Sequence, residues 1–204
     1  MNRRLVFLTL AYLLLPLAAL LALTLFAIRR IPDVSQPHQD ALASIYNEKP
    51  FVQHITPRHN GFSTAIIHLK NASLTNTDPL SFILSNDVGQ TLRLIQISGR
   101  NIGDPDSVRF QFDPIPDSAG KSYTITLQTP YTNFDQPKIE AGVANSGDLT
   151  YELYYRPQSR AELISSVLAS LLPKLSSLQL LILLTLVFFV SYLTLSRKLH
   201  TSGV

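Results

Sequence analysis

The chain has 204 residues and contains neither cysteine nor tryptophan. Without cysteine it has no disulfide, no thiolate metal site and no cysteine nucleophile. An extracytoplasmic location stays open, because a domain of this size is stable without disulfides. The absence of tryptophan weakens the interpretation of the chain as a lectin.

Charged residues are also scarce, at 15% of the chain, and the net charge is +3. The basic residues gather partly beside two apolar ends, which favours membrane orientation over nucleic-acid binding. No basic stretch with interleaved aromatic residues is present, so we expect no nucleic-acid partner.

The motifs of common active sites are missing as well. The sequence has no GxSxG elbow, Walker loop, GxGxxG or HExxH pattern, and its five histidines show no metal-ligand spacing. We therefore predict a chain that is not an enzyme and that needs no cofactor. An enzyme with its site on the loops of the domain is a third hypothesis that no motif supports.

What the sequence does have is a long apolar run at each end. The run Leu5–Ile28 follows a basic head and is long enough to span a bilayer, and Leu178–Leu195 is a second, shorter run. We predict a signal anchor over residues 1–30, a transmembrane helix over 176–197 and a basic tail over 198–204. A cleaved signal peptide is the alternative for the first run.

These two runs define the expected topology. A basic N-terminus before the first apolar run favours termini in the cytoplasm, and a long intervening region is translocated largely regardless of its charge. We predict a two-pass membrane protein whose central domain is extracytoplasmic, with the lipid bilayer as a partner.

The region between the runs shows the period of β-strands. The segments VRFQF (108–112) and SYTITL (122–127) each place alternate apolar residues on one face. The insert DPIPDSAGK between them is rich in proline, aspartate and glycine, which end a strand. The two segments are predicted to form a β-hairpin or a corner between two sheets.

Seven or eight short strands of this kind are predicted within residues 45–157, with no helix between them. The pattern predicts an all-β domain, namely an antiparallel β-sandwich of the jelly-roll type. An immunoglobulin-like sandwich is the main alternative, although its antibody form requires cysteine and tryptophan in the core. Residues 31–44 contain two prolines and are predicted to be a linker.

Residues 158–175 change to the period of a helix. Their apolar residues fall on one stripe, and Ser159 precedes Glu162 by three positions, as in a capping box. We predict an amphipathic helix that lies at the membrane interface or packs on a helix of another membrane protein.

Two groups of residues are candidates for binding. Tyr131 and Phe134 lie in the loop TPYTNFDQP, where exposed rings can stack on a sugar, although core packing explains most of the aromatic residues. Asn71-Ala-Ser is a glycosylation acceptor by pattern. Four aspartates in two turns could supply oxygen ligands for a structural Ca²⁺. They are Asp104, Asp106, Asp113 and Asp117. The alternative role of these aspartates is to form the turns.

The segments Phe110–Pro116, Asp117–Tyr123 and Asp148–Tyr155 resemble parts of a known group of domains. These are the extracytoplasmic, galactose-binding-like jelly-roll modules of bacterial membrane proteins associated with cell-surface glycan assembly. The resemblance covers about half of the β domain and contains no ligand-contacting motif. It implies a jelly-roll fold and a role near cell-surface glycan.

Two functions of different classes follow. The first is a membrane-anchored, non-enzymatic module that engages cell-envelope glycan or positions a glycan-handling enzyme. The second is a structural or assembly subunit of a membrane complex, acting through protein–protein contacts. Aromatic and polar residues gathered on one exposed face would favour the first, and an apolar face depleted of charge would favour the second.

Overall fold

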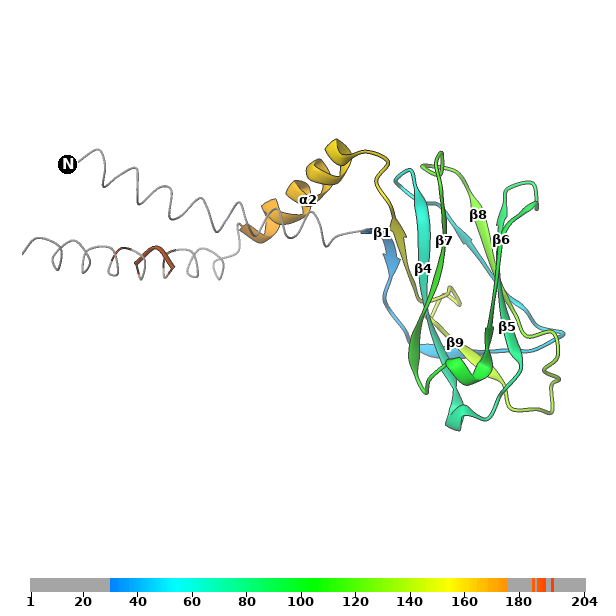
Figure 1. Ribbon diagram of the computed structural model, residues 1–204. Helices are drawn as coiled ribbons and strands as arrows, with labels where there is room; N and C mark the ends of the chain where they lie inside the picture. The colour runs from blue at the N-terminus through cyan, green and yellow to red at the C-terminus, as the bar shows by residue number, and fades with distance from the viewer. Residues whose placement is uncertain (1–29, 176–184, 186, 190–191, 193–204) are drawn as a thin grey trace, which may run out of the picture. The chain divides into compact units, whose positions relative to one another are not determined.

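The computed structural model describes residues 30–175, 185, 187–189 and 192 of the chain (Figure 1). The chain divides into two compact units, one of which is Arg30–Gln158. The described residues from Ser159 onward belong to the other unit. The first unit contains every β-strand of the described residues and is called the β domain below.

The β domain is built from ten strands and two single-turn 3-10 helices. The strands are β1 (Ile31–Gln36), β2 (Ala41–Ile45), β3 (Phe51–Ile55), β4 (Phe62–Asn71), β5 (Pro79–Asn86), β6 (Thr91–Ser98), β7 (Asp106–Ile115), β8 (Tyr123–Gln128), β9 (Ile139–Val143) and β10 (Tyr151–Tyr155). The 3-10 helices are η1 (Ala72–Leu74) and η2 (Gly99–Asn101).

These strands form two antiparallel sheets that pack as a sandwich. One sheet has the order β1-β10-β4-β9-β2, with β7 on the other side of β4, and the second has the order β3-β8-β5-β6. Both sheets contribute to one hydrophobic core. The prediction of an all-β antiparallel sandwich is confirmed.

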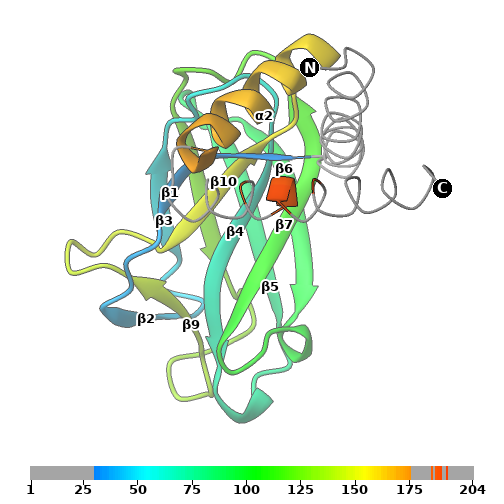
Figure 2. The same cartoon turned by 90° about the vertical axis from the view of Figure 1, so that its left-hand side faces the viewer.

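At two positions in the first sheet, two short strands take the place of one long strand. The strands β9 and β10 lie end to end along one edge of β4, since Leu69 pairs with Ala141 and Ile67 pairs with Tyr151. The strands β1 and β2 follow the same split as partners of β10 and β9 (Figure 2). With each split strand counted once, the two sheets have the orders 1-8-3-6 and 2-7-4-5, which is the arrangement of an eight-stranded jelly roll.

The core confirms the alternation predicted for the two central segments. Val108 and Phe110 of β7 are buried, and so is every second residue of β8. The ring of Phe110 stacks on that of Phe82 in β5, with centroids 4.5 Å apart, so this pair joins one sheet to the other. Because β7 and β8 lie in different sheets, the insert between them forms a corner and not a hairpin.

The predicted linker over residues 31–44 is wrong, because these residues form β1 and β2. Pro32 is tolerated because β1 pairs with β10 alone, and an edge strand does not need every backbone N–H for pairing. The register also shifts between Pro32 and Ser35, which hides the period of two in the sequence. The β domain therefore begins with β1 and not at residue 45.

The predicted helix after the β domain is present as α2 (Arg160–Leu175). Ser159 accepts a hydrogen bond at Oγ from the backbone N–H of Glu162, at 3.1 Å, which confirms it as the N-terminal cap. Among the described residues, no helix has the length and apolar character needed to cross a membrane. The predicted spans over 1–30 and 176–197 lie almost wholly outside the described residues.

Candidate functional site

The two ends of the β domain carry different connections. Ile31 of β1 pairs with Tyr155 of β10, so both connections to the rest of the chain leave from the same end, which we call the junction end. The opposite end, the distal end, carries the β2–β3, β4–β5 and β8–β9 connections. Each end holds one group of residues with the chemistry of a site.

The distal end exposes the two aromatic residues predicted to bind a ligand. Tyr131 and Phe134 lie on the β8–β9 loop (129–138) and are 68% and 69% exposed. The ring of Phe134 meets that of Tyr46 edge to face, with centroids 5.6 Å apart. The ammonium of Lys138 lies 4.6 Å from the Phe134 centroid and 5.8 Å from the Tyr46 centroid. Two rings and a cation therefore form one cluster, with Tyr131 on the same loop.

Buried hydrogen bonds hold the β8–β9 loop in place. Thr132, between the two exposed rings, has no exposed surface and donates from Oγ1 to Asp78 Oδ2 at 2.9 Å. Its Oγ1 accepts from Nδ2 of Asn76, which also donates to the carbonyl of Pro137 at 2.7 Å. The backbone N–H of Asn47 donates to the carbonyl of Thr132 at 2.8 Å. The loop thus presents Tyr131 and Phe134 on a backbone fixed from the core side.

The four aspartates proposed as calcium ligands do not come together. Asp104 and Asp106 lie before and at the start of β7, while Asp113 and Asp117 lie near and beyond its end. Asp104 accepts from the backbone N–H of Ser73, and Asp106 accepts from that of Gly103. Among the residues that the structure describes, no group of three or more acidic or histidine side chains is placed to hold a metal ion.

The sheet β3-β8-β5-β6 has an outer face without a carboxylate, lysine or arginine, which we call the open sheet face. Arg93 is the only charged residue in these four strands, and its guanidinium donates to the carbonyls of Leu92 and Asp113. Val52 and Leu94 are 52% and 58% exposed. The outward residues of this face include no lysine, arginine, aspartate or glutamate, and among them are Val52, His54, Ser81, Ile83, Ser85, Leu94, Gln96, Thr124, Thr126 and Gln128.

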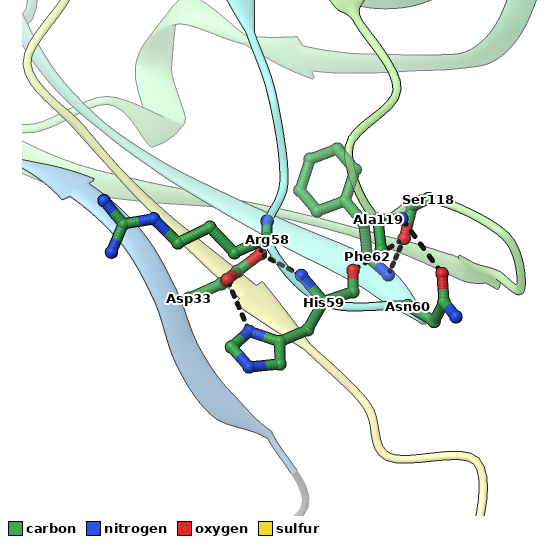
Figure 3. A network of polar contacts seen from close by, with 7 residues as sticks. All are labelled: Asp33, Arg58, His59, Asn60, Phe62, Ser118 and Ala119. Carbon is green, nitrogen blue, oxygen red and sulfur yellow. Dashed lines mark hydrogen bonds and ion pairs between the residues drawn. The ribbon is translucent and has the colours of Figure 1, made fainter.

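The junction end holds a network around a buried carboxylate (Figure 3). The Asp33 side chain has no exposed surface and accepts three hydrogen bonds. Its Oδ1 lies 2.8 Å from Nδ1 of His59, and its Oδ2 accepts from the backbone N–H groups of Arg58 and His59. The ring of His59 stacks on that of Tyr155 with centroids 4.5 Å apart. This network ties the first strand of the domain to the β3–β4 loop and to the last strand.

The His59–Asp33 pair has the composition of a catalytic dyad, so its surroundings matter for the enzyme hypothesis. The nearby Ser118 hydroxyl donates to the backbone carbonyl of His59 and accepts from the N–H of Phe62 (Figure 3). Its hydrogen bonds are thus to backbone groups, whereas a serine nucleophile needs a bond to the imidazole. The hydrogen bonds of Ser118 and Asp33 hold the β3–β4 loop in place.

Several residues of these two groups could not be recognised in the sequence. Tyr46 and Lys138 come together because β2 pairs with β9, and the strand β2 was not predicted. Asp33 and His59 are 26 positions apart, and Asp33 was assigned to a linker. The strand β1 and its register shift would have been needed to predict that contact.

Comparison with known proteins identifies no family. No protein-family profile and no curated protein matches the chain. Solved structures that resemble it include one titled "CBM4 structure and function", with 15% identity, a TM-score of 0.36, and coverage of 59% of this chain and 68% of that one.

Two further solved structures are similar at the same level. One is the carbohydrate-binding module CBM36 in complex with calcium and xylotriose, with 12% identity, a TM-score of 0.33, and coverage of 62% of this chain and 99% of that one. The other is an arabinose-bound α-L-arabinofuranosidase, with 10% identity, a TM-score of 0.35, and coverage of 65% and 24%. With TM-scores this low, the function of the chain has to be argued from its own residues.

Proposed function

We propose that the β domain is a non-enzymatic binding module for saccharides of the cell envelope and that the β8–β9 loop is its contact surface. The observation that carries the proposal is the exposure of Tyr131 and Phe134 on a loop anchored by buried Thr132. Exposed rings offer flat apolar surfaces on which the apolar face of a pyranose stacks.

The anchoring of the loop matters for affinity. Binding through a mobile loop costs about 0.5–1.5 kcal/mol for each side chain that has to be ordered, and more for the backbone. Here the carbonyls of Thr132 and Pro137 already accept hydrogen bonds from Asn47 and Asn76. The loop backbone is therefore ordered before a ligand arrives, and this part of the cost does not oppose binding.

The same proposal includes anchoring in the membrane. We infer it from the two apolar runs, Leu5–Ile28 and Leu178–Leu195, with both termini cytoplasmic and the β domain extracytoplasmic. Both connections leave the β domain at the junction end, so the β8–β9 loop lies at the end without an attachment. A loop at the end opposite both chain connections is suited to binding a polymer.

The test uses the full chain in a detergent without a sugar headgroup, because glycoside detergents compete for a sugar site. An oligosaccharide array is followed by calorimetry on the ligands that bind. We expect saturable binding that weakens at least tenfold in Tyr131→Ala and in Phe134→Ala. Leu94→Ala serves as the control, because Leu94 is an apolar residue on the open sheet face that is also more than half exposed. A folded protein that binds no oligosaccharide would refute the proposal.

The open sheet face favours a second function, an assembly subunit that pairs with another copy of this chain. Two such faces pack against each other without burying a lysine, arginine or carboxylate, because the outward residues include none. The natural chain has no cysteine, so Leu94→Cys introduces a single thiol on this face, in its edge strand β6. A thiol-specific crosslinker applied in membranes should then give a covalent dimer.

The matched control for the crosslink is Val88→Cys, since Val88 is 79% exposed on the β5–β6 turn at the junction end. A dimer from Leu94→Cys alone supports assembly through the open sheet face. Equal yields from both variants indicate random collision, and no yield from Leu94→Cys excludes a dimer through this face.

A further inference from the structure

We propose that the saccharide bound at the distal end carries a carboxylate, and that Lys138 recognises it. This inference rests on the proposed function and names the class of saccharide, an acidic polymer such as one built from hexuronic acids. It depends on three features of Lys138: its place beside the rings, the absence of an acidic partner among the described residues, and the surrounding charges.

The place of Lys138 follows from the pairing of β2 with β9. The register brings Ile45 opposite Ile139, so the residues just beyond this pair, Tyr46 and Lys138, lie side by side. The ammonium lies 4.6 Å from the centroid of Phe134 and 5.8 Å from that of Tyr46. At these distances the faces of both rings attract the cation, which lies over them.

Lys138 differs from the lysine that has an acidic partner in this domain. Lys70 lies 3.7 Å from the carboxylate of Asp104, whereas no carboxylate within the described part of the chain lies within 4.0 Å of the Lys138 ammonium. A cation held by rings alone keeps its hydrogen-bond donors available for an anion. Lys138 is also only partly exposed, so its charge is screened less than that of a free surface lysine.

The geometry of a stacked sugar fits this arrangement. A pyranose that lies flat on a ring directs its ring substituents outward, in the plane of the sugar. The carboxylate of a hexuronic acid is such a substituent, so it comes to the edge of the aromatic surface. The Lys138 ammonium lies over the Phe134 ring, so a carboxylate that projects from a sugar stacked on the adjoining aromatic surface meets it in a charge-assisted hydrogen bond.

Two other charged residues at the distal end provide control variants for Lys138→Gln. Lys49 lies on the β2–β3 connection, is exposed, and makes no ring contact among those of the described residues. Asp135 directly follows Phe134 and is exposed, so its carboxylate repels an acidic ligand. Lys49→Gln therefore removes the same charge as Lys138→Gln from the same end, and Asp135→Asn removes a charge of opposite sign.

The probes are hexuronate oligosaccharides in two forms, the ionised acid and the methyl ester, which differ by one negative charge and one methyl group on each carboxyl group. Binding of both to the full chain is measured by calorimetry in a detergent without a sugar headgroup. We expect the acid to bind about tenfold more tightly than the ester, and Lys138→Gln to remove this preference. Lys49→Gln should keep most of it, and Asp135→Asn should increase it. Raising the NaCl concentration should weaken binding of the acid and leave the ester unchanged.

Three outcomes separate this inference from the proposed function. A preference for the acid that is lost in Lys138→Gln and kept in Lys49→Gln supports it. Equal binding of acid and ester, abolished by Tyr131→Ala, overturns the role of Lys138 while the saccharide site stands. If no neutral or acidic oligosaccharide binds to the folded chain, the proposed function fails and the inference fails with it.

Discussion

Gly61 lies against the backbone of Arg156, where the chain leaves the β domain. The N–H of Arg156 donates to the carbonyl of Gly61 at 2.8 Å, and a Cβ placed on Gly61 would stand 2.2 Å from the carbonyl oxygen of Arg156. Gly61 also has φ of +83°, a conformation that side chains disfavour. Position 61, where the backbone contacts that of Arg156 at the junction end, therefore accommodates only glycine.

Gly61→Ala is therefore expected to destabilise the protein by about 3 kcal/mol or more, because two backbone segments must separate. Gly120 provides the control, since its φ is +71° but no atom lies within 4 Å of its virtual Cβ. Gly120→Ala should cost only the conformational penalty, about 1–2 kcal/mol. Thermal unfolding of the full chain, followed by tyrosine fluorescence, measures both, and equal losses would contradict the role assigned to the Arg156 contact.

The buried carboxylate at the junction end gives a second prediction. Asp33→Asn keeps the shape of the side chain but removes the charge that three hydrogen bonds stabilise. We expect a loss of about 2 kcal/mol or more, because hydrogen bonds to a charged group contribute about 1.5–3 kcal/mol each. His59→Ala should cost less, about 1 kcal/mol, because the ring is half exposed and the two backbone donors remain.

Chemical unfolding of the two variants at pH 7 distinguishes a structural role from a catalytic one. A structural anchor predicts that Asp33→Asn is the less stable variant. Equal stability of Asp33→Asn and the natural chain would mean that the network does not hold the junction end. A catalytic role of the His59–Asp33 pair would then be the remaining hypothesis.

Asn71 supports a third prediction, in which the structure overrules the glycosylation motif. Its side chain has no exposed surface, and Nδ2 donates to the carbonyls of Asn76 and Gly99 at 2.8 Å each. Its Oδ1 accepts from the N–H of Asn76 at 3.0 Å. An amide nitrogen used in this way inside the fold cannot carry a glycan.

We expect Asn71→Ala to destabilise the domain by about 2–4 kcal/mol, because three backbone groups lose their partner in the interior. Asn145→Ala, at an exposed turn, is the control and should change stability by less than about 0.5 kcal/mol. Mass spectrometry of the chain from a glycosylating host should find Asn71 unmodified. A glycan on Asn71 of the folded protein would contradict the burial.

The sequence predicted the parts of the fold that depend on local pattern. Alternation in β7 and β8 identified both strands, because each buries one face in the core. It did not predict β1 and β2, which lie at the edge of the sheet and bury few of their residues, and β1 also contains Pro32. The pairing of these strands determines where the β domain begins.

The same division holds for the sites. Tyr131 and Phe134 were recognised because a ring in a turn-rich loop has no core to enter. Lys138 beside Tyr46, and Asp33 beside His59, depend on strand register over long sequence separations. Register is determined by the whole sheet, so these contacts were not visible in any local segment.

The tyrosines of the β domain give a prediction for alkaline pH. Burial, followed by the negative charge of Asp148, raises the pKa of Tyr151 above its usual value of 10.0. Burial also raises the pKa of Tyr123, with smaller contributions from Asp117 and Asp87. In the unfolded chain these phenols lose their protons near pH 10.0, while in the native domain they hold them to higher pH.

The unfolded state therefore binds fewer protons than the native state once the pH passes 10.0, and stability falls as the pH rises further. Below that pH both states are protonated, and the contribution is fully present. Tyr151→Phe keeps the buried ring but cannot ionise, so its unfolding midpoint should fall less steeply above about pH 10 than that of the natural chain. Far-UV circular dichroism in denaturant measures both midpoints without interference from tyrosinate absorption. Parallel curves for the two proteins would show that Tyr151 ionises alike in the folded and unfolded chains.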